Sequence, residues 1–268
     1  MSKARVPAIV FLSVVMLAAI APELWAPARY EIQFRESPDA PPSARFLLGT
    51  DDLGRDRFTR LLYGARVSLL LAPAAALLSC LGAALLGGAA GLAGGFLEGL
   101  ILGAADLFLS LPWLFLMLTV RACLPLNVSP AASVTITFLL LGALGWAAPA
   151  RILRAAVIRL KDSEFMLFAR ASGCPAPRLL WAHLRPNVMP VLLAQFWVAV
   201  PVFILAEAML GMLGLGVVEP LPSLGGMLRE LESGGGILSQ PWLLSPVVLL
   251  AAVVGCFQLV LPREDYSV

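Results

Sequence analysis

The residues that could carry chemistry in this chain are few and far apart. His183 is the single histidine, so the paired histidines of an HExxH metal site are excluded. The only lysines are Lys3 and Lys161, and no glycine-rich phosphate-binding loop precedes either of them. The four cysteines are scattered and form no CxxC pair. The sequence therefore predicts a chain that binds no cofactor directly and cannot hydrolyse ATP by a Walker-type mechanism.

The composition indicates that the chain lies in lipid. Of its 268 residues, 60% are hydrophobic and only 13% are charged, whereas a water-soluble domain carries about 25% charged residues. So few charges could not cover the surface of a soluble protein of this length. The net charge of +2 is too small to suggest a nucleic-acid partner. The lipid bilayer is therefore the expected solvent.

Six apolar runs are predicted to cross the bilayer, since a transmembrane helix needs about 20 apolar residues. They are residues 6–22, 67–97, 99–120, 122–150, 188–218 and 233–262. Helices are expected throughout, because backbone groups must be satisfied within the bilayer, and the fold class is all-α. The expected organisation is an N-terminal transmembrane helix (1–25), an extracytoplasmic linker with a helix leading into the membrane (26–66), a five-helix core (67–262) and a C-terminal tail (263–268).

The distribution of basic residues predicts the orientation. The loop 151–187 carries seven basic residues against two acidic ones, and Lys3 and Arg5 precede the first run. The positive-inside rule places both regions in the cytoplasm, so six spans put both termini there as well. The first run also has the basic start, apolar middle and Ala19-Ile20-Ala21 ending of a signal peptide. Cleavage would leave five spans in the same orientation, and both interpretations stay open.

Two carboxylates lie alone within apolar runs. Asp106 is in the third run and Glu207 is in the fifth. An ionisable residue at membrane depth is a functional candidate by default, so both are candidates for a proton pathway. Both also lie near the ends of their runs, where a purely structural charge is the alternative.

Glycines predict two features of the helices. A glycine recurs at every fourth residue from Gly87 to Gly103, which favours close packing of the second and third spans. Gly211, Gly214 and Gly216 lie together before two prolines, which predicts an interrupted helix at the outer end of the fifth span.

The segment 161–187, which reads KDSEFMLFARASGCPAPRLLWAHLRPN, is a charged insert between long apolar runs. Asp162 or Ser163 is a candidate helix N-cap, and Phe165, Phe168 and Ala169 then share one face. Gly173 suits a left-handed C-terminal cap, and the prolines after it prevent continuation of the helix. The pattern predicts a short helix with an aromatic knob that faces the cytoplasm. It would dock on a partner that supplies energy, or it would lie on the membrane surface.

Several motifs, in order along the chain, resemble the permeases of the dipeptide/oligopeptide/nickel class of ABC importers. The most specific is GTDDLGRD at residues 49–56, and RLLYGARVSL follows at 60–69. Further matches are DLFLSLP at 106–112, Ala150-Arg151 with Arg154, LGMLGLG at 210–216, PSLG at 222–225 and Pro241-Trp242.

The loop is similar to the cytoplasmic coupling motif of that family. The matching residues are Ala169, Arg170, Ala171, Gly173, His183, Pro186 and Asn187. Three positions depart from the family pattern: Leu167 replaces Glu, Phe168 replaces Ala and Leu224 replaces Trp. The ending from 257 to 268 also lacks the glycine- and aspartate-rich sequence of the family.

The resemblance implies a permease subunit with the type I ABC importer fold, in a bacterial inner membrane, working by alternating access. Its implied partners are a second homologous permease, two cytoplasmic ATPases that use ATP, and an extracytoplasmic solute-binding protein. The implied ATPase contacts are Phe165, Phe168, Ala169, Arg170 and Gly173, while His183 and Pro186 hold the second loop helix. The substrate would be a peptide, nickel or a similar small solute.

Two other classes of protein stay open from the sequence. A stand-alone secondary transporter or channel is one, although the two halves show no convincing internal repeat. An intramembrane enzyme is the other, although the single histidine and the lack of paired membrane carboxylates argue against it. Only the importer subunit would require ATPase partners in equal numbers.

Overall fold

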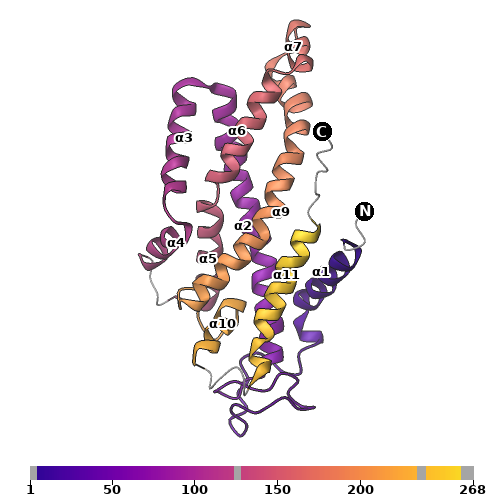
Figure 1. Ribbon diagram of the computed structural model, residues 1–268, viewed down its shortest axis with the longest axis vertical. Coiled ribbons are helices and arrows are strands. Elements are labelled where there is room, and N and C mark those ends of the chain that lie inside the picture. Colours follow the sequence, from indigo (N-terminus) through magenta and orange to yellow (C-terminus); the bar gives the residue numbers. More distant parts are fainter. Residues whose placement is uncertain (1–4, 124–127, 234–239, 261–268) are drawn as a thin grey trace. The chain divides into compact units, whose positions relative to one another are not determined.

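Four helices are long and apolar enough to cross a membrane in the computed structural model, which describes residues 5–123, 128–233 and 240–260 (Figure 1). They cover Arg57–Ala93, Pro130–Lys161, Ala176–Met212 and Pro241–Val260. A bent pair, Gly95–Ser110 and Trp113–Ala122, supplies a fifth candidate, and the first apolar helix is shorter. The described residues are helical apart from turns, irregular segments and one isolated bridge between Thr50 and Asp56. The all-α fold class is confirmed.

The helices differ in detail from the predicted spans. Their bounds are α1 Arg5–Ile20, α2 Arg57–Ala93, α3 Gly95–Ser110, α4 Trp113–Ala122, α5 Pro130–Leu144, α6 Ala147–Lys161, α7 Glu164–Ala171, α8 Ala176–Arg178, α9 Arg185–Met212, α10 Leu224–Ser233 and α11 Ser245–Val260. Short helical turns η1, η2 and η3 cover Pro22–Leu24, Leu179–Leu184 and Pro241–Leu244. The predicted C-terminal tail, 263–268, lies outside the described residues.

The third predicted span, 99–120, is not one continuous helix. The chain bends by 90° between α3 and α4. Leu111, between the two helices, has an extended backbone with ψ 134°. It precedes Pro112, and the proline ring disfavours the helical conformation of the residue before it. The helix expected to lead into the membrane at the end of 26–66 begins at Arg57 and forms the first turns of α2.

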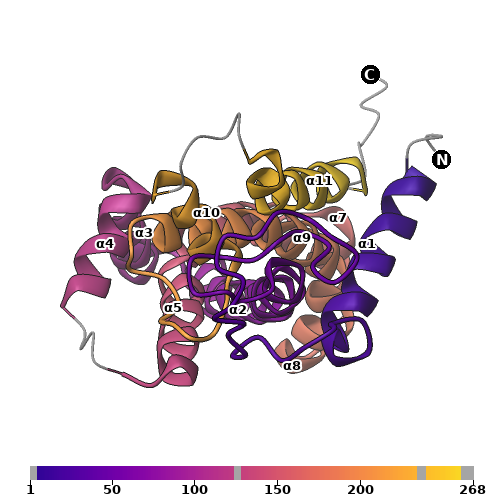
Figure 2. The ribbon, with the colours of Figure 1, turned by 90° about the horizontal axis from the view of Figure 1, so that it is seen from below.

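The chain divides into two compact units. The first consists of residues 1–73, 118–138 and 201–268, and the second of residues 74–117 and 139–200. In the first unit, α1 packs against α11, and α10 and η3 also contact α11 (Figure 2). The segment between η1 and α2 is irregular and is fixed by hydrogen bonds of Thr50, whose Oγ1 donates to Ser37 O at 2.5 Å and accepts from Ala40 N at 2.9 Å.

In the second unit, α3 packs against α6, and glycines let α2 approach α6 closely. A methyl group at Gly87 would overlap the backbone of Ala150, and one at Gly91 would overlap the side chain of Val157. Gly99 and Gly103 face open space. The predicted close packing is therefore confirmed for two of the glycines, but α2 makes it with the fourth span and not with the third.

Candidate functional site

Helix α7 forms where the sequence predicted a short loop helix. Ser163 precedes it in an extended conformation, and its carbonyl oxygen accepts from the amides of Met166 and Leu167 at 3.0 Å. The Ser163 hydroxyl does not cap the helix, however. It donates instead to Leu160 O at 2.5 Å, because the chain turns so tightly after α6 that this carbonyl is within reach. The N-terminal position was predicted correctly, and the capping bond was not.

A single side chain anchors α7. Met166 is 2% exposed and packs in a cluster with Leu153 and Val157 of α6, Leu184 of η2 and Val188 of α9. Burying such a side chain contributes roughly 1.5–3 kcal/mol. The helix is therefore tied to both of the membrane helices that it connects.

The opposite side of α7 is apolar and open. Phe168 is 75% exposed, Leu167 50% and Phe165 43%. Arg170 is exposed beside them, while Ala169 is half-buried. Phe165 and Phe168 therefore form the predicted aromatic knob. Leu167 belongs to the same surface, although the sequence analysis did not place it among the contact residues. Leu167 could have been included because it is an apolar residue directly beside Phe168 on a short helix, of which only Met166 is buried.

Gly173 ends the helix as expected. Its φ of 78° lies in the left-handed region, its amide donates to Arg170 O at 3.0 Å, and the Cys174 amide donates to Ala169 O at 3.1 Å. Glycine adopts this conformation without steric cost. The chain can therefore reverse immediately after α7.

The second loop helix continues directly into a membrane helix. Helix α8 leads into η2, a π-helical stretch, and then into α9. His183 is half-buried in η2, and its carbonyl accepts from the Asn187 side chain at 2.7 Å. Pro186 is exposed in the first turn of α9. Short π-helical segments are frequent at functional sites, because they interrupt the regular hydrogen bonding of a helix.

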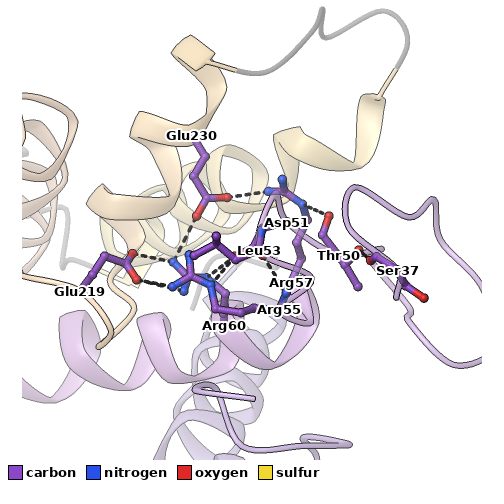
Figure 3. A network of polar contacts seen from close by, with 9 residues as sticks. All are labelled: Ser37, Thr50, Asp51, Leu53, Arg55, Arg57, Arg60, Glu219 and Glu230. Atoms are coloured by element: carbon purple, nitrogen blue, oxygen red, sulfur yellow. Dashed lines mark hydrogen bonds and ion pairs between the residues drawn. The ribbon is translucent and has the colours of Figure 1, made fainter. Parts of the chain in front are cut away.

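A second group of polar residues lies in the first unit, and we call it the arginine network: Asp51, Arg55, Arg57, Arg60, Glu219 and Glu230 (Figure 3). Arg60 is 1% exposed and donates to Glu219 at 2.8 Å and to Glu230 at 3.1 Å. The three arginines and three carboxylates of the network balance in charge. Desolvated charges are stable only when they are paired in this way.

The network closes the GTDDLGRD turn and joins it to α10. Arg55 bonds Asp51 at 2.6 Å and Glu219 at 2.5 Å. Arg57 bonds Glu230 at 2.7 Å and the Thr50 carbonyl at 3.0 Å. The sequence analysis used this motif as a family signature but assigned no contacts to it. Glu219 and Glu230 lie 159 to 173 residues from their arginines, so no local spacing could have identified them.

The pKa values of the two glutamates of the network are shifted in opposite directions. Burial raises the pKa of the Glu219 carboxyl, but the guanidinium groups of Arg60 and Arg55 outweigh it and hold that pKa below its usual value. For Glu230, burial outweighs Arg60 and Arg57 and raises the pKa of the carboxyl. Glu219 is also the more exposed of the two side chains, at 54% against 22%.

The two carboxylates in the apolar runs have different surroundings. Asp106 is 57% exposed and forms an ion pair with Arg151 of α6 at 2.8 Å, within the second unit. Glu207 is fully buried in the first unit, and its Oε2 accepts from the Ser68 hydroxyl at 2.8 Å. Asp106 thus has the partner of a structural charge. Glu207 has a hydroxyl neighbour and stays a candidate for the pathway.

Comparison with known proteins decides the class. The family described as "Binding-protein-dependent transport system inner membrane component" matches residues 83–262, which include α7 and the loop around it. The chain belongs to this family. It is a permease subunit of an ABC importer, as the motifs predicted, and the family consists of transport components. The intramembrane enzyme and the stand-alone transporter are therefore set aside.

Curated relatives of the permease extend the match beyond that region. The oligopeptide transport system permease protein OppC of Bacillus subtilis (strain 168) is 35% identical over 230 residues, or 85% of this chain and 72% of the relative. The dipeptide transport system permease protein DppC of the same organism is 33% identical, over 82% of this chain and 67% of the relative. The di/tripeptide transport system permease protein DppC of Pseudomonas aeruginosa (strain UCBPP-PA14) is 33% identical, over 93% of this chain and 84% of the relative. Multi-pass insertion in an inner membrane follows for this permease.

Proposed function

We propose that the permease imports short peptides and that α7 couples this transport to ATP hydrolysis by partner subunits. The observation that carries the proposal is the two-sided character of α7. One buried methionine ties it to α6, η2 and α9, and an exposed apolar surface covers its other side. An apolar surface of this kind, beside charged residues, is typical of a site for another protein.

Docking on α7 would transmit movement efficiently. Met166 contacts side chains from α6 and α9, so a displacement of α7 is passed to both helices. Phe165, Phe168, Ala169, Arg170 and Gly173 then form or shape the contact, while His183 and Pro186 hold the turn into α9. Leu167 stands where the family motif has a glutamate, so the contact proposed for this surface is apolar at that position.

The remaining partners follow from the family. A second homologous permease completes the translocation path, two cytoplasmic ATPases bind and hydrolyse ATP, and a solute-binding protein delivers the substrate from outside. The basic loop that contains α7 faces the cytoplasm, as do both termini. This permease itself binds no cofactor.

Peptides are proposed as the substrate because the three relatives described above are named for oligopeptide, dipeptide and di/tripeptide transport. A nickel complex is the other substrate class suggested by the sequence motifs. None of those three relatives is named for nickel, so peptides are the first substrate to test.

The experiment is reconstitution of the four-subunit complex in proteoliposomes with its binding protein. We expect ATP-dependent uptake of a labelled dipeptide, and no ATP hydrolysis by the purified permease alone. Uptake of labelled nickel but not of any peptide would contradict the proposed substrate. ATP hydrolysis by the isolated permease would contradict the proposal that the partner subunits hydrolyse ATP.

A further inference from the structure

A polar cavity lies beside the arginine network, within the first unit. It measures about 490 Å³ and is lined by Asp52, Leu53, Arg55, Glu219, Gly226, Arg229 and Glu230. Binding sites for small molecules usually have volumes of about 300–1,000 Å³. The cavity is therefore large enough for a molecule such as a dipeptide.

The charges that line the cavity fall into two groups. Arg55, Glu219 and Glu230 belong to the network, in which Arg55 pairs with Glu219 and Glu230 pairs with Arg57 and Arg60. Asp52 and Arg229 are exposed, and neither forms an ion pair with any residue in the described part of the chain. One negative and one positive charge without ion pairs in the described residues thus line the same cavity, and its other charges belong to the neutral arginine network.

This arrangement complements a zwitterion better than it complements a simple ion. A carboxylate accepts hydrogen bonds from an ammonium group, and an arginine presents a fork of donors that matches a carboxylate. A ligand with a net negative charge would be repelled by Asp52, and a ligand with a net positive charge would be repelled by Arg229. A molecule with an ammonium group at one end and a carboxylate at the other would satisfy both.

We propose that this cavity binds the charged termini of a short peptide, with Asp52 receiving the ammonium group and Arg229 receiving the carboxylate. The inference rests on the proposed function, since it assigns a site to the same substrate class. Residues 49–66 precede the second span and were predicted to lie outside the cytoplasm. The cavity would then meet a peptide on the side from which the binding protein delivers it.

The network gives the two side chains a rigid support. Asp52 directly follows Asp51, which is 1% exposed and bonded to Arg55. Arg229 directly precedes Glu230, which is bonded to Arg57 and Arg60. Each binding residue is therefore adjacent to a fixed member of the network. Pre-organisation of this kind reduces the entropic cost of binding.

The test measures binding of L-alanyl-L-alanine to the complete complex in nanodiscs without the binding protein, by saturation-transfer NMR. Asp52→Asn and Arg229→Gln should each weaken binding by about tenfold, since hydrogen bonds to charged groups are worth about one such factor. Free L-alanine, N-acetylated dialanine and dialanine amide serve as further probes. Asp52→Asn should no longer distinguish dialanine from its acetylated form, and Arg229→Gln should no longer distinguish it from the amide.

Glu36→Gln and Arg35→Gln are the matched controls, because these exposed charges lie in the same unit but outside the lining of the cavity. They should leave dialanine binding unchanged. Stimulation of ATPase activity by loaded binding protein is measured on every sample. If stimulation is intact but dialanine does not bind, or binds equally to all variants, the cavity assignment is overturned while the proposed function stands. If free L-alanine binds as tightly as dialanine, the assignment to peptides is overturned.

Discussion

Helix α7 is held by one apolar side chain, whereas the GTDDLGRD turn is held by three arginines and three carboxylates. The first arrangement leaves most of a short helix exposed. The second buries its arginines almost completely. The contrast fits the two roles proposed above, since a docking helix must offer surface to a partner, whereas a support must fix the positions of its own residues.

The difference also predicts how each region fails. A single anchor can be removed at moderate cost, because the residual cavity can partly collapse. A buried charge that loses its partner cannot adapt in this way, since its desolvation is no longer compensated. The following variants test this contrast, from the largest expected effect to the smallest.

Arg60→Met should have the largest effect on stability. It removes a fully buried guanidinium from Glu219 and Glu230, and breaking one side of a buried ion pair costs about 3 kcal/mol. Arg66→Met is the matched control on the same helix, because the ion pair of Arg66 with Glu23 is exposed and contributes little to stability. Thermal unfolding in detergent checks both, and equal losses of stability would contradict the account of the network.

Met166→Ala should come next, at about 2–3 kcal/mol, because it leaves a cavity in the cluster under α7. Its comparison is Leu167→Ala, which alters an exposed residue on the same helix and should change stability by less than about 0.5 kcal/mol. Both should reduce stimulated ATPase activity, for different reasons. If Leu167→Ala destabilises the permease as much as Met166→Ala does, the assignment of the two faces is wrong.

Gly173→Val should impair stimulated ATPase activity more than expression. No atom lies within 4 Å of the added Cβ, so the cost arises from the left-handed backbone and is about 1–2 kcal/mol. Gly173→Asn is the control, since asparagine tolerates that conformation. A fully active valine variant would show that the turn after α7 is not needed in this form.

Glu219→Gln should give the smallest effect, and it should appear as a change in pH dependence. A carboxyl whose pKa is lowered by folding contributes stability above its unfolded pKa of about 4.3, and loses it as pH falls through the lower folded value. The variant should therefore lose less stability than wild type between about pH 5 and pH 3. Because Glu219 is half exposed, the difference should be small. If the melting temperatures of the variant and of wild type fall by the same amount between the two pH values, this role of Glu219 is refuted.

The α7 loop could largely be predicted from the sequence, since helix period, capping and glycine geometry are local. Ser163, Phe168 and Gly173 occupy the expected positions, although the Ser163 hydroxyl donates to Leu160 O and does not cap the helix. The bend at Pro112 was missed, because the apolar composition continues through it.

The arginine network could not be predicted, because its partners are remote in sequence. The arginines of residues 55–60 showed only that charges are concentrated before the second span. Which carboxylates face them depends on how α9 ends and how α10 returns. That path is set by tertiary packing and not by local spacing.

The most direct test of the central claim is the effect of Phe168→Asp on ATPase activity stimulated by the binding protein in proteoliposomes. Phe168 is the most exposed residue of the α7 surface, and a carboxylate buried there in an apolar groove would be left without a partner. Ala182→Asp, at an exposed position in η2, adds the same charge elsewhere in the loop as a control. We expect the Phe168 variant to lose most of its stimulation while the control keeps it. Unchanged stimulation in Phe168→Asp would show that α7 is not the element that couples this permease to its ATPase.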